Sequence, residues 1–171
     1  LSWQRNRILL FRQFWTDLLA GLIEPREAVI RDDLTDRGLA LNQAHSFFPV
    51  LIVSAFPDFS RSEVSFRKSG RDCHKAAEAV FKASEVPFFS LFQSDASLLV
   101  IREFSYGETA GALADTENLC AKFLEDLTYE ERPGIFCYLG EPCPITRLPD
   151  MVEELQTMSY QNVVLDHSVV T

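Results

Sequence analysis

One run of apolar residues limits what this chain can fold into more than any other feature of its sequence. Residues 47–56 are almost entirely apolar, and polar residues and then Pro57-Asp58 bound the run. A continuous apolar run of this length, rich in aromatic and β-branched residues, is typical of a buried strand. Pro49 lies near its start, where a strand tolerates proline. We therefore expect a buried central strand here.

The segments after this strand alternate in a clear order. Helical spacing of apolar residues covers 62–84 and 109–127, and a closing helix begins at about 145 or 149 and ends at 158. Strand-like runs cover 88–92, 98–104 and 135–140, and the polar residues 93–97 between the first two predict a β-hairpin. The resulting βαββαβ order predicts an α+β fold of the ferredoxin-like type, an antiparallel sheet with helices on one face.

Two helices are expected before this body, and the first carries an apolar seam. Its members follow one another at spacings of three, four, three and four: Ile8, Phe11, Trp15, Leu18 and Leu22. Such a seam packs on the chain's own sheet or pairs with the same helix of another chain, and both readings remain open. The second helix, 27–37, ends at Gly38. We expect a helical extension over 1–38 and a ferredoxin-like domain over 39–171.

Charge and cysteine content exclude several classes of protein. The formal net charge is −9, which disfavours DNA binding by this chain itself and also disfavours anionic membranes. No apolar run approaches the 18 residues of a transmembrane helix. The four cysteines form no CxxC pair, so we expect reduced thiols, a cytoplasmic protein, and neither metal nor cofactor. The start, without an initiator Met, suggests a piece of a longer protein.

Few residues suggest chemistry. Phosphate-loop, dinucleotide-binding and nucleophile-elbow motifs are missing from the sequence, and the paired carboxylates lie in charged stretches beside helices. Arg67, Arg71 and Lys75 recur every four residues and form the one concentrated basic face. That face is either a solvated helix surface or a docking surface for an acidic neighbour or an anionic ligand.

The hairpin between two helices, followed by Ile-Phe-Cys-Tyr-Leu-Gly at 135–140, resembles a degenerate GGDEF domain. Residues 93–97 occupy the place of the signature, and only Asp95 matches it. Only Asp58 is acidic where that family's first strand ends in metal-binding carboxylates. Cyclase chemistry needs two divalent cations held by carboxylates, so we expect no diguanylate cyclase activity.

A narrower resemblance extends from about residue 8 to 165. Residues 9–21, Leu-Leu-Phe-Arg-Gln-Phe-Trp-Thr-Asp-Leu-Leu-Ala-Gly, are similar to the FWxDLLxG helix in the middle region of YesN-type response regulators. Residues 139–145, 148–149 and 161–164 resemble the closing segment of the same group. These regulators have an amino-terminal CheY-like receiver and a carboxy-terminal AraC-type DNA-binding domain.

This resemblance implies a non-catalytic domain that couples the receiver to the DNA-binding domain of the same full-length chain. Under this hypothesis we also expect a homodimer, formed through the apolar seam of the first helix, that reaches DNA only through the carboxy-terminal domain. A second hypothesis is a sensing domain that binds a sugar or a nucleotide, with Arg67, Arg71 and Asp95 as candidate contacts. A residual enzyme is a third hypothesis, which no group of residues in the sequence supports.

Overall fold

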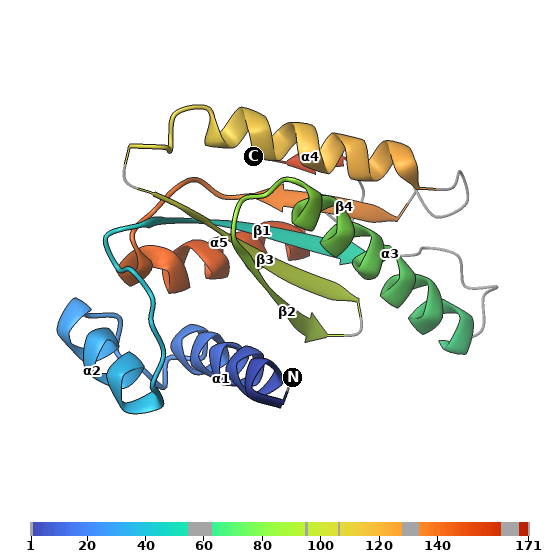
Figure 1. Ribbon diagram of the computed structural model, residues 1–171. Coiled ribbons are helices and arrows are strands. Elements are labelled where there is room, and N and C mark those ends of the chain that lie inside the picture. The colour runs from blue at the N-terminus through green and yellow to red at the C-terminus, as the bar shows by residue number, and fades with distance from the viewer. Residues whose placement is uncertain are drawn as a thin grey trace.

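The computed structural model describes residues 2–54, 63–94, 96–105, 107–127, 134–161 and 168–170, which form an α+β fold, as expected (Figure 1). The helices are α1 (Ser2–Leu19), α2 (Glu27–Arg37), α3 (Glu63–Ala83), α4 (Ala112–Asp126) and α5 (Leu148–Gln161), with a 3-10 turn at Ile145–Arg147. The strands are β1 (Ser46–Ser54), β2 (Phe88–Ser94), β3 (Ser97–Phe104), β4 (Ile135–Leu139) and β5 (Ser168–Val170).

The strands form one sheet in the order β2-β3-β1-β4-β5, with β1 at its centre. β1 runs antiparallel to both of its neighbours, β3 and β4, and β2 pairs antiparallel with β3. The predicted central strand and the predicted hairpin are therefore confirmed. The parallel pairing of β5 with β4 was not expected from the sequence. β2 forms one edge of the described sheet.

Both faces of the sheet are covered by helices, so the expectation of helices on one face is wrong. Side chains alternate along β1: Phe47 and Leu51 join one apolar cluster, and Phe48 and Ile52 join another. The second cluster is closed by α3 and α4, as expected. The first cluster is closed by α1, α2 and α5, which lie on the opposite side of the sheet (Figure 1). A central strand that is apolar on both faces requires both covers, because either exposed face would leave large apolar side chains in water.

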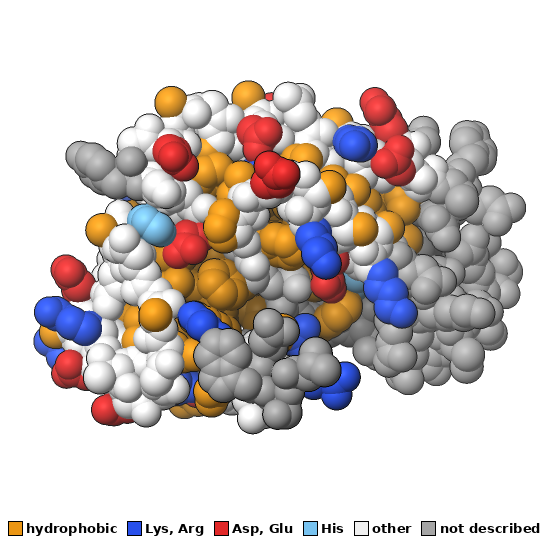
Figure 2. Space-filling model, in the orientation of Figure 1, with side chains coloured by type: hydrophobic (Ala, Val, Ile, Leu, Met, Phe, Trp, Pro, Cys, Tyr) orange, Lys and Arg blue, Asp and Glu red, His pale blue; other side chains and the backbone are white. Residues whose placement is uncertain are grey.

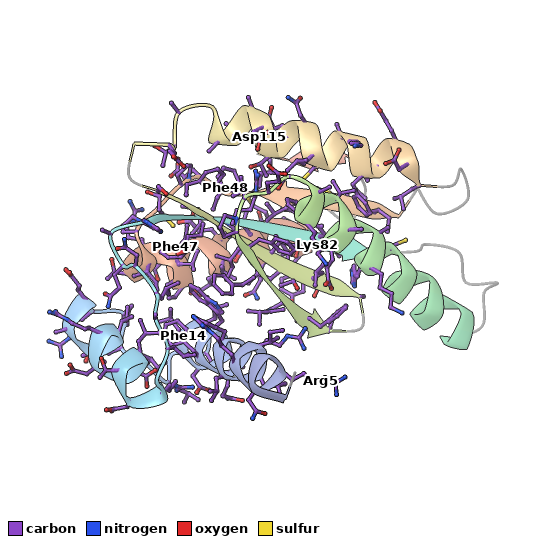
Figure 3. The ribbon with its side chains drawn as sticks, viewed as in Figure 1. Arg5, Phe14, Phe47, Phe48, Lys82 and Asp115 are labelled. Carbon is purple, nitrogen blue, oxygen red and sulfur yellow. The ribbon has the colours of Figure 1, made fainter. Side chains whose placement is uncertain are left out.

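Arg102 of β3 is the largest polar residue among the described side chains that are fully buried. Its guanidinium donates to Thr116 Oγ1 at 2.6 Å and to the Asp115 carboxylate at 2.9 Å, both on α4. The same group lies over the rings of Phe81 and Phe104, at 5.8 and 5.0 Å from the centroids. Arg102 therefore connects the sheet to α3 and α4, and the label of Asp115 in Figure 3 marks the α4 end of this connection.

Close packing of α5 on the sheet depends on Gly140, which directly follows β4. A Cβ atom at this position would lie 2.9 Å from Cγ of Pro49 and 3.1 Å from Cγ of Met151. The Gly140 amide also donates to the Pro49 carbonyl at 3.0 Å, so the backbone has little freedom to move away. A side chain here therefore conflicts with both β1 and α5.

We expect Gly140→Ala to lower the free energy of unfolding by about 1–3 kcal/mol, because overpacking forces neighbouring side chains or backbone to shift. Denaturant unfolding of both proteins measures this. Ala114→Ser, on the exposed side of α4, is the control and is expected to stay within about 0.5 kcal/mol. An unchanged midpoint for Gly140→Ala would show that α5 does not pack this closely on β1.

Candidate functional site

The helix that carries the predicted seam is anchored to the sheet by its second half. Trp15 is fully buried, and its ring lies 5.6 Å from that of Phe47 on β1 and 5.2 Å from that of Phe89 on β2. Phe14 and Leu18 are fully buried in the same cluster. The label of Phe14 in Figure 3 lies on the side of α1 that faces the sheet. α1 thus belongs to the core of the described chain.

The seam residues differ in how deeply they are buried. Trp15 and Leu18 pack on the chain's own sheet, and Phe11 is partly buried against the same cluster. Ile8 keeps 53% of its surface exposed, and Leu22, beyond the end of α1, keeps 77%. The seam is therefore anchored at its centre and exposed at its two ends, and pairing between chains is left to those ends.

An ion-pair network joins α1 to α2. Arg37 at the end of α2 donates to Asp17 of α1 at 2.8 Å and to Asp33 of α2 at 2.7 Å. All three side chains are at most about a quarter exposed. The hydrogen bond from Arg37 holds the pKa of the Asp17 carboxyl below its usual value, although partial burial opposes this shift. The network makes α1 and α2 one unit.

Of the three residues predicted to contact a ligand or partner, none can be assigned a contact. Arg67 and Arg71 lie on α3, as expected for a helical face, but their side chains are outside the described part of the structure. Asp95 lies outside the described residues altogether. Lys75 and Lys82 of the same helix are described and exposed. Figure 2 shows Lys or Arg side chains over α3, and Figure 3 labels Lys82 on that helix. The docking hypothesis for this face stays a prediction.

One hollow in the described surface lies where α1, the end of β2 and α5 meet. It has a volume of about 670 Å³. Its polar lining comes from Thr16 of α1, Gln93 of β2, and Asp150, Glu153 and Gln156 of α5, with leucines of α1 beneath. A second hollow of about 260 Å³ shares Gln93 and Gln156 with the first. Between these two residues, the Gln156 amide donates a hydrogen bond to the Gln93 amide oxygen at 3.1 Å. None of the lining residues is Lys or Arg, so this cleft does not favour an anion.

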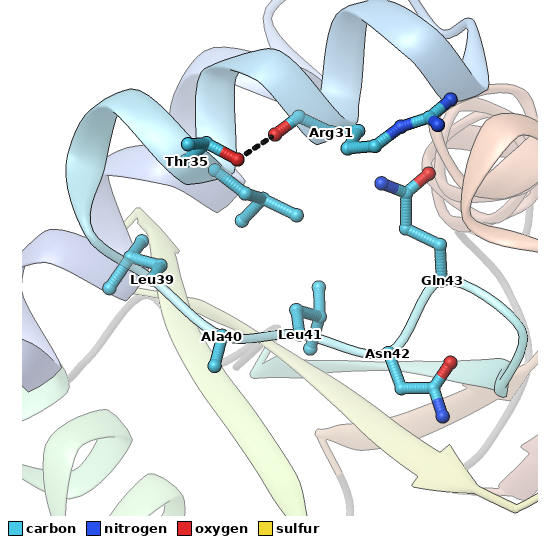
Figure 4. Close-up of a pocket in the computed structure, with 8 residues that line it drawn as sticks. Arg31, Thr35, Leu39, Ala40, Leu41, Asn42 and Gln43 are labelled. Carbon is cyan, nitrogen blue, oxygen red and sulfur yellow. Dashed lines mark hydrogen bonds between the residues drawn. The ribbon is translucent and has the colours of Figure 1, made fainter.

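A separate hollow of about 410 Å³ lies between α2 and the segment that leads to β1 (Figure 4). Arg31 is the one charged residue in its lining, and Thr35 uses its hydroxyl to donate to the Arg31 carbonyl at 2.9 Å. The remaining lining is mostly apolar, with Leu39 and Leu41 among its residues (Figure 4). This hollow holds no pair of groups suited to acid–base chemistry.

Two buried polar groups were not identified from the sequence. Arg102 follows the apolar residues 98–101 of β3 and precedes Glu103, and an Arg at the end of such an apolar run is the signal that could have revealed it. His74 of α3 is fully buried, its ring lies 5.3 Å from that of Phe92, and burial lowers its pKa to about 4. Its spacing of three and seven residues from Ala77 and Phe81 places it on the apolar face of the helix, and this spacing is the signal that the sequence offered.

Within the described residues, no three His, Cys, Asp or Glu side chains gather in a way that could hold a metal ion. No helix in this part of the chain has the length and apolar character needed to cross a bilayer. All four cysteines are buried free thiols. Comparison with protein-family models and with curated proteins finds no match for the chain.

The Arg37 network predicts a defined pH dependence. Arg37→Gln is expected to lower the free energy of unfolding at pH 7 by about 1 kcal/mol, because two partly buried carboxylates lose their partner. The lowered pKa of Asp17 stabilises the fold above the carboxyl's ordinary value of 3.8, and this contribution disappears as the pH falls through the folded-state pKa. Urea unfolding of both proteins between pH 7 and pH 2 should therefore converge at the acid end.

Arg26→Gln is the matched control, because the Arg26–Glu24 pair is more than half exposed on both sides. It is expected to have almost no effect at any pH. If Arg37→Gln and Arg26→Gln behave alike, the network does not fix α1 to α2.

Proposed function

We propose that this chain is a non-catalytic regulatory domain of a two-component response regulator that controls transcription. It links a receiver to an AraC-type DNA-binding domain of the same full-length chain, and it touches DNA only through that domain. The observation that carries this proposal is the burial of Trp15 between Phe47 and Phe89. Trp15 belongs to the segment that resembles the FWxDLLxG helix of YesN-type regulators, and it makes that helix part of the sheet's core.

The finer fold belongs to the same proposal. The strands and helices from β1 to β4 follow one another as strand, helix, strand, strand, helix, strand. The hairpin of β2 and β3 lies between α3 and α4 along the chain, which is the element order of a ferredoxin-like, GGDEF-like domain. α1, α2 and α5 are additions that cover the second face. This order supports the resemblance without any cyclase signature.

The mechanism follows from the anchoring of α1. A helix whose second half is part of the core cannot rotate alone, so a displacement of α1 carries the sheet and α2 with it. Signal transfer needs two discrete arrangements of such an element rather than continuous bending. In the homodimer that we propose, a change in the receivers shifts the two bodies relative to each other and resets the spacing of the DNA-binding domains.

The full-length protein tests this coupling. Reading the gene on both sides of this segment comes first, and a receiver upstream and a double helix-turn-helix downstream are expected. Phosphorylation of the receiver by a small phosphodonor should then raise affinity for the target DNA at least about tenfold. Trp15→Leu should abolish most of this gain, because it loosens α1 from Phe47 and Phe89.

Leu113→Ala is the matched control, since Leu113 is an exposed apolar residue on α4, away from α1. It should retain the gain. Both variants must bind DNA in the unphosphorylated state as the parent does, which separates lost coupling from lost folding. An unrelated gene context, or full coupling in Trp15→Leu, would contradict the proposal.

A second candidate function is ligand sensing, and the cleft between α1, β2 and α5 favours it. Gln93 and Gln156 offer amide groups, Asp150 and Glu153 offer carboxylates, and Tyr160 lies 80% exposed beside the smaller hollow. Amides and carboxylates bind the hydroxyl groups of a sugar, whereas the carboxylates repel the phosphates of a nucleotide. Among the two ligand classes, the cleft therefore favours a neutral sugar.

A thermal-shift series with neutral sugars and with GTP tests this candidate. A sugar that binds the native state raises the unfolding midpoint as its concentration rises, and GTP leaves it unchanged. Gln156→Leu should abolish the sugar shift, and Gln161→Leu, exposed at the end of α5, should preserve it. A shift with GTP alone, or none with any sugar, would reject the sugar assignment.

A further inference from the structure

β2 is an edge strand of the described sheet, and its first five residues carry none of the usual protection against pairing. Its seven residues, Phe88–Ser94, include three Phe and one Leu, with no charged residue and no proline. Proteins ordinarily protect exposed edges with lysine, proline, bulges or a covering element, because an open edge pairs readily with another strand. The register shift in β2 comes only at its far end, between Phe92 and Ser94. The first five residues of β2 thus form a regular, uncharged edge.

The hydrogen-bond pattern shows which backbone groups face outward. Glu103 donates its amide to the Pro87 carbonyl at 2.9 Å, in the register that pairs Phe88 with Arg102. Hydrogen-bonded pairs alternate along an antiparallel ladder, so Phe89 and Leu91 bond to β3. Phe88, Ser90 and Phe92 turn their N–H and C=O groups to the free side, and we call these groups the β2 edge.

Phe88, Ser90 and Phe92 have no backbone partner on that side among the described residues. Three outward N–H groups and three outward C=O groups are therefore available to a further strand. Their spacing at every second residue is the spacing that an added antiparallel strand requires.

The edge is also chemically self-complementary. Its sequence, Phe-Phe-Ser-Leu-Phe over 88–92, has the same residue type or a similar apolar one at positions equidistant from Ser90. A twofold axis through Ser90 would oppose Phe88 to Phe92 of the partner subunit, and Phe89 to Leu91 of the partner subunit. Isologous interfaces require such a match of a surface with itself. The 53% exposed side chain of Phe92 would then pack on another aromatic ring.

Charge supports a second copy as the occupant. The first sixteen residues contain Arg5, Arg7 and Arg12 and no Asp or Glu, whereas the whole chain has a net charge of −9. These three arginines are exposed. Arg12 lines a groove of about 310 Å³ between α1 and β2, together with Ile8 and Phe11 of α1. Glu78 of α3 lines the same groove, so both signs of charge lie beside the uncharged edge, as an interface that meets its own copy requires.

We propose that two copies of this chain pair antiparallel through the β2 edge, with Ser90 on the twofold axis. The two sheets become continuous, and the partner covers the exposed first half of α1, residues 5–10. The inference does not depend on the proposed regulatory function, because it rests on the strand, its register and its charge alone.

Ser90→Pro tests the proposal directly. The Ser90 amide points away from β3, so proline removes an outward donor without removing a β2–β3 hydrogen bond. Analytical ultracentrifugation of the parent chain is expected to give a mass of about twice 19.4 kDa. The dimer dissociation constant of Ser90→Pro is expected to be at least tenfold higher than that of the parent. Ser90→Thr, which keeps the amide, should dimerise as the parent does. Far-UV circular dichroism and the unfolding midpoint establish that each variant is folded.

Ser90→Lys provides a second test if proline disturbs the strand, because a charge on the twofold axis repels its own copy. Leu9→Glu distinguishes pairing through α1 alone, since Leu9 is 58% exposed on that helix. A parent that is monomeric at 100 μM would overturn the proposal. A stable dimer that persists in both Ser90→Pro and Ser90→Lys but dissociates in Leu9→Glu would also overturn it, and would assign the contact to α1.

Discussion

The packing of Trp15 between Phe47 and Phe89 determines how the rest of this structure is arranged. The central strand β1 is apolar on both sides, so its two faces each need a cover. α3 and α4 cover one face, and α1, α2 and α5 cover the other. Trp15 is the largest fully buried side chain among the described residues, and it brings α1 against two strands at once. Without it, α1 would lose its ring contacts with Phe47 and Phe89 and would be held on the sheet by Phe14 and Leu18.

Much of this fold follows from local sequence patterns. The apolar run at β1, the polar break between β2 and β3, and the glycine after α2 each have a simple physical cause. At Gly38 the backbone adopts φ +70°, and its amide bonds back to the carbonyls of Leu34 and Thr35, as a helix end with glycine predicts. Each of these signals depends only on residues close together in the sequence, so the corresponding features could be predicted from the sequence.

Long-range packing was harder to predict. The seam of α1 was compatible with the chain's own sheet and with another chain, because spacing shows that a helix has an apolar face but not what covers it. The cover on the second face was missed for the same reason. Arg102 can be buried because Thr116 and Asp115 of α4 accept its hydrogen bonds. These partners lie on another element, and no local sequence pattern predicts them. The cleft lined by Gln93 and Gln156 joins segments 63 residues apart.

The regulatory proposal depends on a rigid connection within the domain. A domain that positions other domains needs no cluster of catalytic groups, and what it needs is a rigid connection between its first helix and its body. Trp15 and the Arg37 network supply that connection. The exposed half of α1 and the uncharged β2 edge lie beside each other and remain available for contacts outside the domain.

Amide hydrogen exchange along α1 tests most directly whether this helix is part of the core. Residues 14–19 should exchange as slowly as the central strand β1, because opening them exposes Trp15. Residues 5–10 should exchange faster in the monomer, because Ile8, Leu9 and Leu10 are exposed there. Fast exchange along the whole of α1 while β1 stays protected would contradict the account, since α1 would then be attached to the domain without belonging to its core.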